Sequence, residues 1–270
     1  MSELRNYRLT VAFDGTDFAG WQCQARRRTV QATLEASLES ISQCRTHVVA
    51  AGRTDAGVHA AGLTVSFRSP WGHSSHDLER ALNAVLPRDV AVRDVEEVSE
   101  AFHARYSASR REYRYRVYES PVRVPYLDRY AWRVAVPLDL DRMREASALL
   151  VGEADFRSFG QAPTGRTTVR TVYSAAWKRS ELDGFGAWGW EFEIAANGFL
   201  RGMVRRIVGT LVQAGVGTIG PDGMRDILLS RDPSRAAAPA PADGLFFWRA
   251  CYPDVAYSGG DEVCRLAAAG

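Results

Sequence analysis

One short segment has residue types and spacing that could support catalysis. Residues 52–60 read GRTDAGVHA, so Gly52 and Gly57 bracket the carboxylate of Asp55. Small residues on both sides let the backbone bend tightly and let a substrate approach. A carboxylate held in this way could act as a catalytic nucleophile or base. An Asp that bonds its own turn is the commoner case, and local chemistry alone favours it.

Arginine is clustered at three places along the chain. Residues 103–116 read HARYSASRREYRYR, with five Arg against one Glu, and further clusters lie at 26–28 and 201–206. A basic run interleaved with Tyr is typical of RNA-binding surfaces, because Arg binds phosphate and Tyr stacks on bases. The net charge is only +2, however, and Lys178 is the only lysine. A general bias toward Arg explains the bulk excess equally well, and a charge run is more often a solvated face.

The remaining composition excludes several classes of protein. The four cysteines form no C-x-x-C pair, and the histidines form no H-x-x-x-H pattern. We therefore expect no metal, no zinc site and no disulfide framework. No apolar run approaches the length of a membrane span, and the polar N-terminus does not resemble a secretory signal. These features predict a cytoplasmic protein.

The hydrophobic pattern of the first half predicts six elements in the order β-α-β-β-α-β. Strands are expected at 7–13, 46–50, 62–68 and 90–98, and helices at 29–41 and 75–86. Thr29 is a candidate N-cap for the first helix, and Pro87 ends the second. Asp55 then falls in the loop between the second and third strands.

The second half repeats this order of elements without a residue-level repeat. Strands are expected at 112–118, 171–178, 188–195 and 245–252, and helices at 139–150, 199–214 and 221–229, with a turn at Asp183-Gly184. Strand alternation places Tyr113, Tyr115 and Val117 on one face and the intervening Arg residues on the other.

Two successive β-α-β-β-α-β units predict an α+β fold with two ferredoxin-like halves, each sheet covered by helices on one face. We expect an N-terminal half at 1–105 that carries the Asp55 loop and a C-terminal half at 106–257. Residues 258–270 show no periodic pattern and are expected to be a disordered tail.

Seven segments resemble the tRNA pseudouridine synthase A family, and they run in family order from Phe18 to Leu245. Residues 52–60 are similar to the catalytic motif of that family. The other six segments are FAGWQ at 18–22, TVQ at 29–31, FHARYSA at 102–108, REYRY at 111–115, MVRRIVG at 203–209 and APADGL at 240–245. The loop at 159–170 is shorter than in some members of the family, which leaves details of the RNA contact open.

The resemblance implies an isomerase that breaks the N1 glycosidic bond of uridine, turns the base and rejoins it through C5. It implies uridines 38, 39 and 40 of the tRNA anticodon arm as substrates, no cofactor, and a flipped uridine, because a stacked base cannot turn. It also implies that the two sheets join into one mixed, mostly antiparallel sheet with a catalytic cleft between the halves. Finally, it implies a homodimer in which one tRNA contacts both protomers.

The resemblance assigns catalytic roles to three residues. Asp55 matches the catalytic Asp of the family, which would either attack C1′ or remove a sugar proton to give a glycal. Arg205 matches the Arg that pairs with this Asp, and a nearby Arg would keep the carboxylate ionised. Tyr113 matches the Tyr that stacks on uracil and assists proton transfer at C5. For Tyr115 we prefer plain core packing, and we assign no catalytic role to His59 or His103.

Three more residues are expected to bind substrate together with Tyr113. Arg53 would contact phosphate and orient the flipped nucleotide, and Leu245 would form an apolar wall of the uracil pocket. Arg201 lies one turn before Arg205 in the expected helix, so both side chains would point at one site. The alternatives are that these Arg residues are ordinary surface or phosphate-binding residues and that Leu245 is a core residue.

Two other classes of function compete with the isomerase. A non-catalytic tRNA-binding protein or tRNA chaperone on the same scaffold would keep the Arg-rich face but would not need Asp55. A hydrolase would need a second carboxylate beside Asp55, and no other Asp or Glu sits in a comparable glycine-bracketed loop. The intact segment at 52–60 favours the isomerase over both.

Overall fold

The computed structural model describes residues 4–253 except 163, 183–187 and 221. The described residues fall into two compact units. The first contains the described part of 1–111 together with 247–253, and the second contains the described part of 112–246. Strand pairing is mostly antiparallel and helices are interspersed with strands, so the predicted α+β class is confirmed. The turn expected at Asp183-Gly184 and the tail expected at 258–270 lie outside the described residues.

The first unit follows the predicted β-α-β-β-α-β order. Its elements are β1 (Arg5–Phe13), α1 (Val30–Ser42), β2 (Val48–Ala50), β3 (His59–Ser69), α2 (Ser75–Val85) and β4 (Val90–Glu97). The strands are arranged in the order β4-β1-β3-β2, and all three pairings are antiparallel. β10 (Leu245–Cys251, its first two residues in the second unit) also pairs with β3. This connectivity is that of a ferredoxin-like unit, which confirms the prediction for the first half.

Both helices of the first unit bury one apolar face. α2 packs along β4, and α1 contacts α2 and β2. Leu34 and Leu38 of α1 and Leu78 and Leu82 of α2 are fully buried, as their four-residue spacing requires. The Thr29 hydroxyl accepts a hydrogen bond from the Ala32 amide at 3.4 Å, so Thr29 is the N-cap of α1 as predicted.

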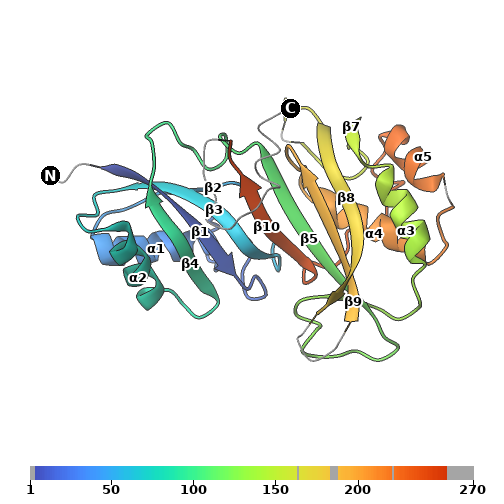
Figure 1. The fold of residues 1–270 in the computed structure, drawn as a ribbon, viewed down its shortest axis with the longest axis horizontal. Helices are drawn as coiled ribbons and strands as arrows, with labels where there is room; N and C mark the ends of the chain where they lie inside the picture. The colour runs from blue at the N-terminus through green and yellow to red at the C-terminus, as the bar shows by residue number, and fades with distance from the viewer. Residues whose placement is uncertain (1–3, 163, 183–187, 221, 254–270) are drawn as a thin grey trace. The chain divides into compact units, whose positions relative to one another are not determined.

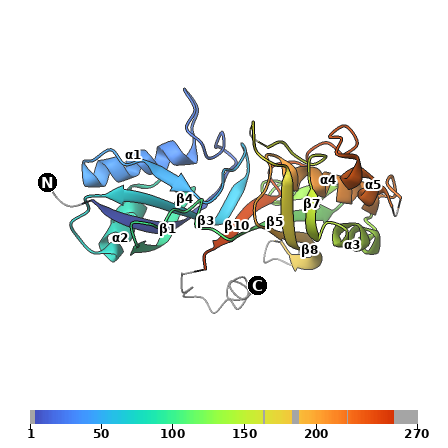
Figure 2. The ribbon, with the colours of Figure 1, turned by 90° about the horizontal axis from the view of Figure 1, so that it is seen from above.

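The second unit contains more elements than the sequence predicted. They are β5 (Arg110–Glu119, its first two residues in the first unit), β6 (Trp132–Val134), α3 (Leu140–Ala148), β7 (Gly152–Asp155), β8 (Val169–Glu181), β9 (Trp188–Ala196), α4 (Met203–Gly215) and α5 (Gly223–Ser230). The strand order is β5-β9-β8-β7, and β6 pairs with β5 in parallel. In both views the helices α3, α4 and α5 lie together beside β7 and β8 (Figures 1 and 2).

Two features of the second unit differ from the prediction. β6 and β7 were not predicted, because strands of three or four residues are too short to show an alternating pattern. The expected start of a helix at Phe199 is wrong, since α4 begins at Met203. Gly202 has a φ of +72°, and Arg201 forms an isolated β-bridge with Gln161. The chain before Met203 is therefore not helical.

Cysteine chemistry also differs at one position. Cys23 and Cys44 are free, but Cys251 is disulfide-bonded, which corrects the expectation from cysteine spacing. In the part of the chain that the structure describes, no helix is long and apolar enough to cross a membrane. Among the same residues, no group of three His, Cys, Asp or Glu side chains could hold a metal ion.

A buried carboxylate organises the polar face of the second-unit sheet. Glu191 of β9 is 2% exposed and binds the guanidinium groups of Arg114 (3.2 Å) and Arg116 (3.0 Å) on β5. The ammonium group of Lys178 on β8 lies 3.3 Å from the same carboxylate and 2.6 Å from Glu193. Glu191 therefore connects three strands through ion pairs. Removing it would take away the carboxylate that binds Arg116 and would leave Glu193 to balance Arg114 and Lys178.

We expect Glu191→Gln to lower the free energy of unfolding by about 1–3 kcal/mol. Loss of a fully buried pair costs roughly 3–5 kcal/mol, but the cations here are partly exposed and water screens them. Urea unfolding measures the change. Glu145→Gln on the exposed face of α3 is the control and should change stability by less than about 0.5 kcal/mol. Equal, small effects of both substitutions would contradict the role of Glu191.

Candidate active site

Asp55 lies on the loop between β2 and β3, as predicted. Thr54 before it and Val58 three residues after it are buried, whereas Asp55 is half-exposed and Arg53 is exposed. The Val58 amide donates to the Asp55 carbonyl oxygen at 3.2 Å, which closes a tight turn. Gly57, the third residue of this turn, has a φ of +78°, as a type II turn requires. Thr54 and Val58 therefore anchor the loop in the core, and the Asp55 side chain remains partly accessible to solvent.

The segment 18–21 holds the Asp55 loop from the side. The Trp21 amide donates to the Thr54 carbonyl oxygen at 3.1 Å, and the Gly57 amide donates to the Phe18 carbonyl oxygen at 3.3 Å. One bond therefore fixes the backbone before Asp55 and the other fixes it after. The rings of Phe18 and Trp21 are each 3% exposed, so the supporting segment is anchored in the core.

Gly20 allows these two stretches of backbone to approach each other. It has a φ of +92°, and a Cβ atom built there would lie 2.6 Å from the Thr54 carbonyl oxygen. The carbonyl oxygens of Gly20 and Trp21 in turn accept hydrogen bonds from the amides of Val30 (3.2 Å) and Gln31 (3.0 Å). Amides of the first helical turn have no partner within the helix, so the segment also connects the loop to the start of α1.

The two histidines near the motifs serve the backbone. His59 is 1% exposed, and its Nδ1 accepts a hydrogen bond from the Gly15 amide at 3.0 Å. His103 Nδ1 accepts from the amides of Arg105 (3.2 Å) and Tyr106 (3.3 Å). These contacts give each imidazole a structural role.

Arg205 and Leu245 both lie in the second unit and are connected through the loop at 240–245. Arg205 lies in the first turn of α4, and its Nε donates to the Ala240 carbonyl oxygen at 2.7 Å. The Ala240 amide donates to the Arg205 carbonyl oxygen at 3.0 Å. Leu245, at the end of the same loop, is 5% exposed, and its amide donates to Ala242 at 2.9 Å. The orientation of the guanidinium group is therefore fixed by the loop that carries Leu245.

Tyr113 and Tyr115 differ in what they contact. Tyr113 packs edge-on against the Phe199 ring, with centroids 4.9 Å apart. Tyr115 is fully buried, and its hydroxyl donates to the Pro241 carbonyl oxygen at 2.8 Å. Burial raises the pKa of Tyr115 well above its usual value, and the charge of Arg205 only partly offsets that rise. Tyr115 therefore acts as a neutral donor that holds the loop next to Arg205, a role that core packing alone does not describe.

The helical argument for Arg201 is wrong. Because α4 begins at Met203, Arg201 does not lie one helical turn before Arg205. It is an exposed residue whose backbone exchanges two hydrogen bonds with Gln161, at 3.2 and 3.4 Å. Helix spacing therefore no longer supports a shared site for these two Arg residues, and a role for Arg201 needs separate support.

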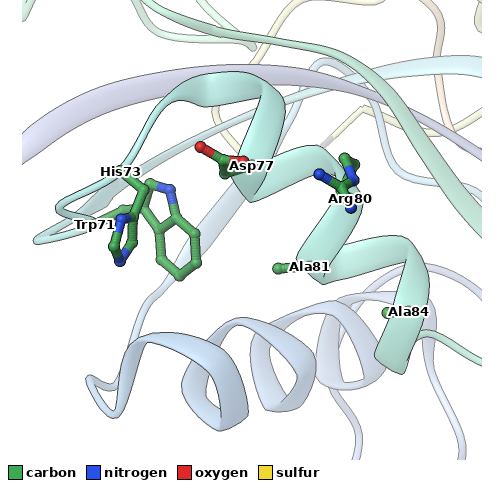
Figure 3. Close-up of a pocket in the computed structure, with 6 residues that line it drawn as sticks. All are labelled: Trp71, His73, Asp77, Arg80, Ala81 and Ala84. Carbon is green, nitrogen blue, oxygen red and sulfur yellow. The ribbon is translucent and has the colours of Figure 1, made fainter.

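A cavity in the first unit lies away from the Asp55 loop. It has a volume of about 470 Å³ and is lined by Trp71, His73, Asp77, Arg80, Ala81 and Ala84 on and before α2 (Figure 3). Trp71 follows the end of β3, whereas Asp55 precedes its start, and a strand of 11 residues spans roughly 35 Å. None of the expected site residues lines this cavity, so it is separate from the candidate active site.

The sequence pointed to the reactive groups more readily than to the residues that hold them. Asp55, Arg205 and Leu245 were assigned through similarity to a family, since local chemistry alone favours a turn Asp at position 55. Residues 18–22 were part of the same similarity. The supporting role of Phe18, Gly20 and Trp21 was not predicted, because it depends on hydrogen bonds to a segment far along the chain.

The antiparallel ferredoxin-like first unit and the half-exposed Asp55 on its braced loop define an α+β protein with a candidate catalytic Asp. Comparison with known proteins then identifies the family. The family model described as tRNA pseudouridine synthase matches residues 9–107 and 146–253. The chain belongs to the tRNA pseudouridine synthase family, an isomerase family that converts uridine to pseudouridine.

Curated relatives match nearly the whole chain. The tRNA pseudouridine synthase A of Bacillus velezensis is 42% identical over 248 residues, which cover 91% of this chain and 98% of the relative. That of Chloroflexus aurantiacus is 43% identical over 252 residues, covering 93% and 90%. That of Bacillus subtilis is 40% identical over 248 residues. The match therefore extends well beyond the motif at 52–60.

We expect Gly20→Ala to loosen the Asp55 loop. The new methyl group would clash with the Thr54 carbonyl oxygen and strain the positive φ, at a combined cost of about 1–3 kcal/mol. Limited trypsin digestion with mass spectrometry should show cleavage after the exposed Arg53 several times faster than in the parent protein. Gly72→Ala is the control, since no atom lies within 4 Å of its Cβ position. Equal cleavage rates in the two variants would contradict this role of Gly20.

We expect Tyr115→Phe to cost about 1–3 kcal/mol at neutral pH, because the partly buried Pro241 carbonyl loses its donor. The raised pKa of Tyr115 adds a pH signature. The unfolded chain ionises near pH 10 while the folded chain stays protonated, so this contribution to stability is present below pH 10 and falls as the pH rises above it. Urea unfolding between pH 7 and 11 should show a smaller alkaline loss in Tyr115→Phe. The exposed Tyr106→Phe should leave the profile unchanged.

Proposed function

We propose that this protein isomerises uridine to pseudouridine at positions 38, 39 and 40 in the anticodon arm of tRNA, with Asp55 as the catalytic carboxylate. The observation that carries the proposal is the half-exposed position of Asp55 on a loop fixed by backbone bonds on both sides. This loop lies within residues 9–107, which match the family model. The names of the curated relatives supply the tRNA substrate.

The reaction needs neither an oxidant nor an energy source. The N1–C1′ bond breaks, a C5–C1′ bond forms, the proton on C5 is lost and N1 gains a proton, so uridine and pseudouridine are isomers. Asp55 either attacks C1′ to form a covalent intermediate or removes a sugar proton to give a glycal. Both routes begin from an ionised carboxylate. We propose that the enzyme works without a cofactor or a metal.

Arg205 and Tyr113 complete the proposed catalytic set. Arg205 is proposed to pair with Asp55 and keep it ionised, since an opposite charge favours the charged form. Its Nε is occupied by Ala240, which orients the rest of the guanidinium group. Tyr113 is proposed to stack on uracil and to assist proton transfer at C5. Tyr113 lies outside the residues matched by the family model, so its role rests on its place in β5 and on the segment 111–115.

The proposed substrate contacts use both apolar and basic groups. Leu245 would form an apolar wall for the flipped base, because an extruded base is held by stacking and apolar contact. Arg53 and Arg201 are exposed and would bind the phosphate backbone, which makes binding depend on salt. We further propose that the enzyme is a cytoplasmic homodimer in which one tRNA contacts both protomers.

We expect purified protein to release tritium from C5-labelled uridine in unmodified tRNA without added metal or cofactor. Transcripts that keep a single labelled uridine at position 38, 39 or 40 test each position separately. Asp55→Asn preserves the size of the side chain and should reduce release at least 100-fold while tRNA affinity changes less than about threefold, because only the reactive group is lost.

Three results would contradict the proposal in different ways. Tritium release by Asp55→Asn at the parent rate would remove Asp55 from the reaction. Binding of tRNA by the parent protein without any release would favour a non-catalytic tRNA-binding protein. Release from other positions only would leave the isomerase and change the substrate site.

A further inference from the structure

Arg28 lies against the segment that supports the Asp55 loop. Its guanidinium group makes two hydrogen bonds to Asp89, with Nη1 2.6 Å from Oδ2 and Nη2 2.8 Å from Oδ1. The same group lies over the ring of Phe18, with Cζ 4.0 Å from the ring centroid. A planar guanidinium group can donate hydrogen bonds to a carboxylate along its edge while its face stacks on an aromatic ring. An ammonium group cannot combine these two contacts in this way.

The backbone around this pair is tied to the same place. The Ala19 amide donates to the Arg28 carbonyl oxygen at 2.8 Å, and the Asp14 amide donates to the Asp89 carbonyl oxygen at 3.0 Å. Phe18, whose ring Arg28 covers, accepts the amide of Gly57 through its own carbonyl oxygen. A continuous set of contacts therefore runs from Asp89 through Arg28 and Phe18 to the turn that carries Asp55.

The charges of the pair support each other. The hydrogen bond from Arg28 lowers the pKa of Asp89, and the hydrogen bond to Asp89 raises the pKa of Arg28. Both groups therefore stay charged across the neutral range. The side chains are 42% and 26% exposed, so the pair should add little to overall stability. Its geometry is nevertheless bidentate, which fixes direction as well as distance.

We propose that Arg28 and Asp89 form a positioning clamp for the catalytic loop. The clamp holds the Phe18 ring, the Phe18 carbonyl holds the Gly57 amide, and the turn at 55–58 keeps the Asp55 carboxylate in its reactive place. Neither residue touches substrate. The inference rests on the proposed function for its effect on catalysis, but its effect on the loop is independent of that function.

The first test separates positioning from phosphate binding. Arg28→Gln and Asp89→Asn should each lower kcat for tritium release about tenfold, with KM for tRNA changed less than about threefold. The double variant should be no more than two- to threefold worse than either single variant, because both remove one device. Arg28→Lys should behave like Arg28→Gln, since it keeps the charge but not the bidentate geometry.

The other outcomes overturn the clamp. If Arg28 bound RNA phosphate, Arg28→Gln would raise KM, Arg28→Lys would largely restore it, and Asp89→Asn would leave kcat unchanged. Unchanged kcat in all the folded variants would also contradict the proposal. Arg68→Gln is the matched control, because Arg68 forms an exposed 3.9 Å pair with Glu100 in the same unit.

The second test does not depend on activity. Amide hydrogen exchange at Gly57 should become at least tenfold faster in Arg28→Gln and Asp89→Asn. The amide of Ala51, which donates to the Thr64 carbonyl oxygen at 2.8 Å, should keep its rate. If the two variants exchange Gly57 faster than the parent but the parent releases no tritium, the clamp is retained and the proposed function is rejected. Unchanged exchange at Gly57 would reject the clamp alone.

Discussion

The pair of backbone hydrogen bonds on either side of Asp55 is the constraint on which the first unit's site depends. Trp21 donates to the residue before Asp55, and Phe18 accepts from a residue two positions after it. A side chain within a strand would alternate between a buried and an exposed face. A loop whose backbone is hydrogen-bonded on both sides of Asp55 instead stays ordered while the Asp55 side chain remains accessible to a substrate. That combination suits a carboxylate that must meet a substrate in a defined direction.

The second unit solves a similar problem with side-chain donors. The loop at 240–245 contains Pro241, which has no amide to offer to a ladder. The carbonyl oxygens of Ala240 and Pro241 are bound by the side chains of Arg205 and Tyr115. The backbone of α4 also lies very close to the segment before this loop, because a Cβ atom at Gly209 would lie 2.4 Å from the Ala238 carbonyl oxygen. Arg205 thus has a structural bond as well as a proposed catalytic one, and the first orients the second.

The periodic elements of this fold were predictable, and the irregular ones were not. Leu34 and Leu38 on α1, or Leu78 and Leu82 on α2, carry a spacing that any helix with one buried face must have. β6 and β7 carry no such signal, since three or four residues acquire strand geometry from their neighbours. The start of α4 was missed because Phe199, Leu200 and Met203 continue the apolar pattern, while the positive φ of Gly202 interrupts the helix. The site divides in the same way. The bracketing glycines drew attention to Asp55. Residues 18–22 and the Arg cluster at 26–28 also stood out in the sequence, but neither indicated that Phe18 and Arg28 support the Asp55 loop.

Stability and positioning are therefore separable in this protein. The residues that fill the core, such as Phe18 and Trp21 at 3% exposure each, contribute to both, because burial is the main source of folding energy. A partly exposed ion pair such as Arg28–Asp89 contributes little to folding, since water screens it. It can still fix an orientation, and a displacement of about 1 Å at a reacting group can cost about 100-fold in rate. A sequence can therefore keep its stability while losing such a pair, and selection on the reaction rather than on the fold would be needed to retain it.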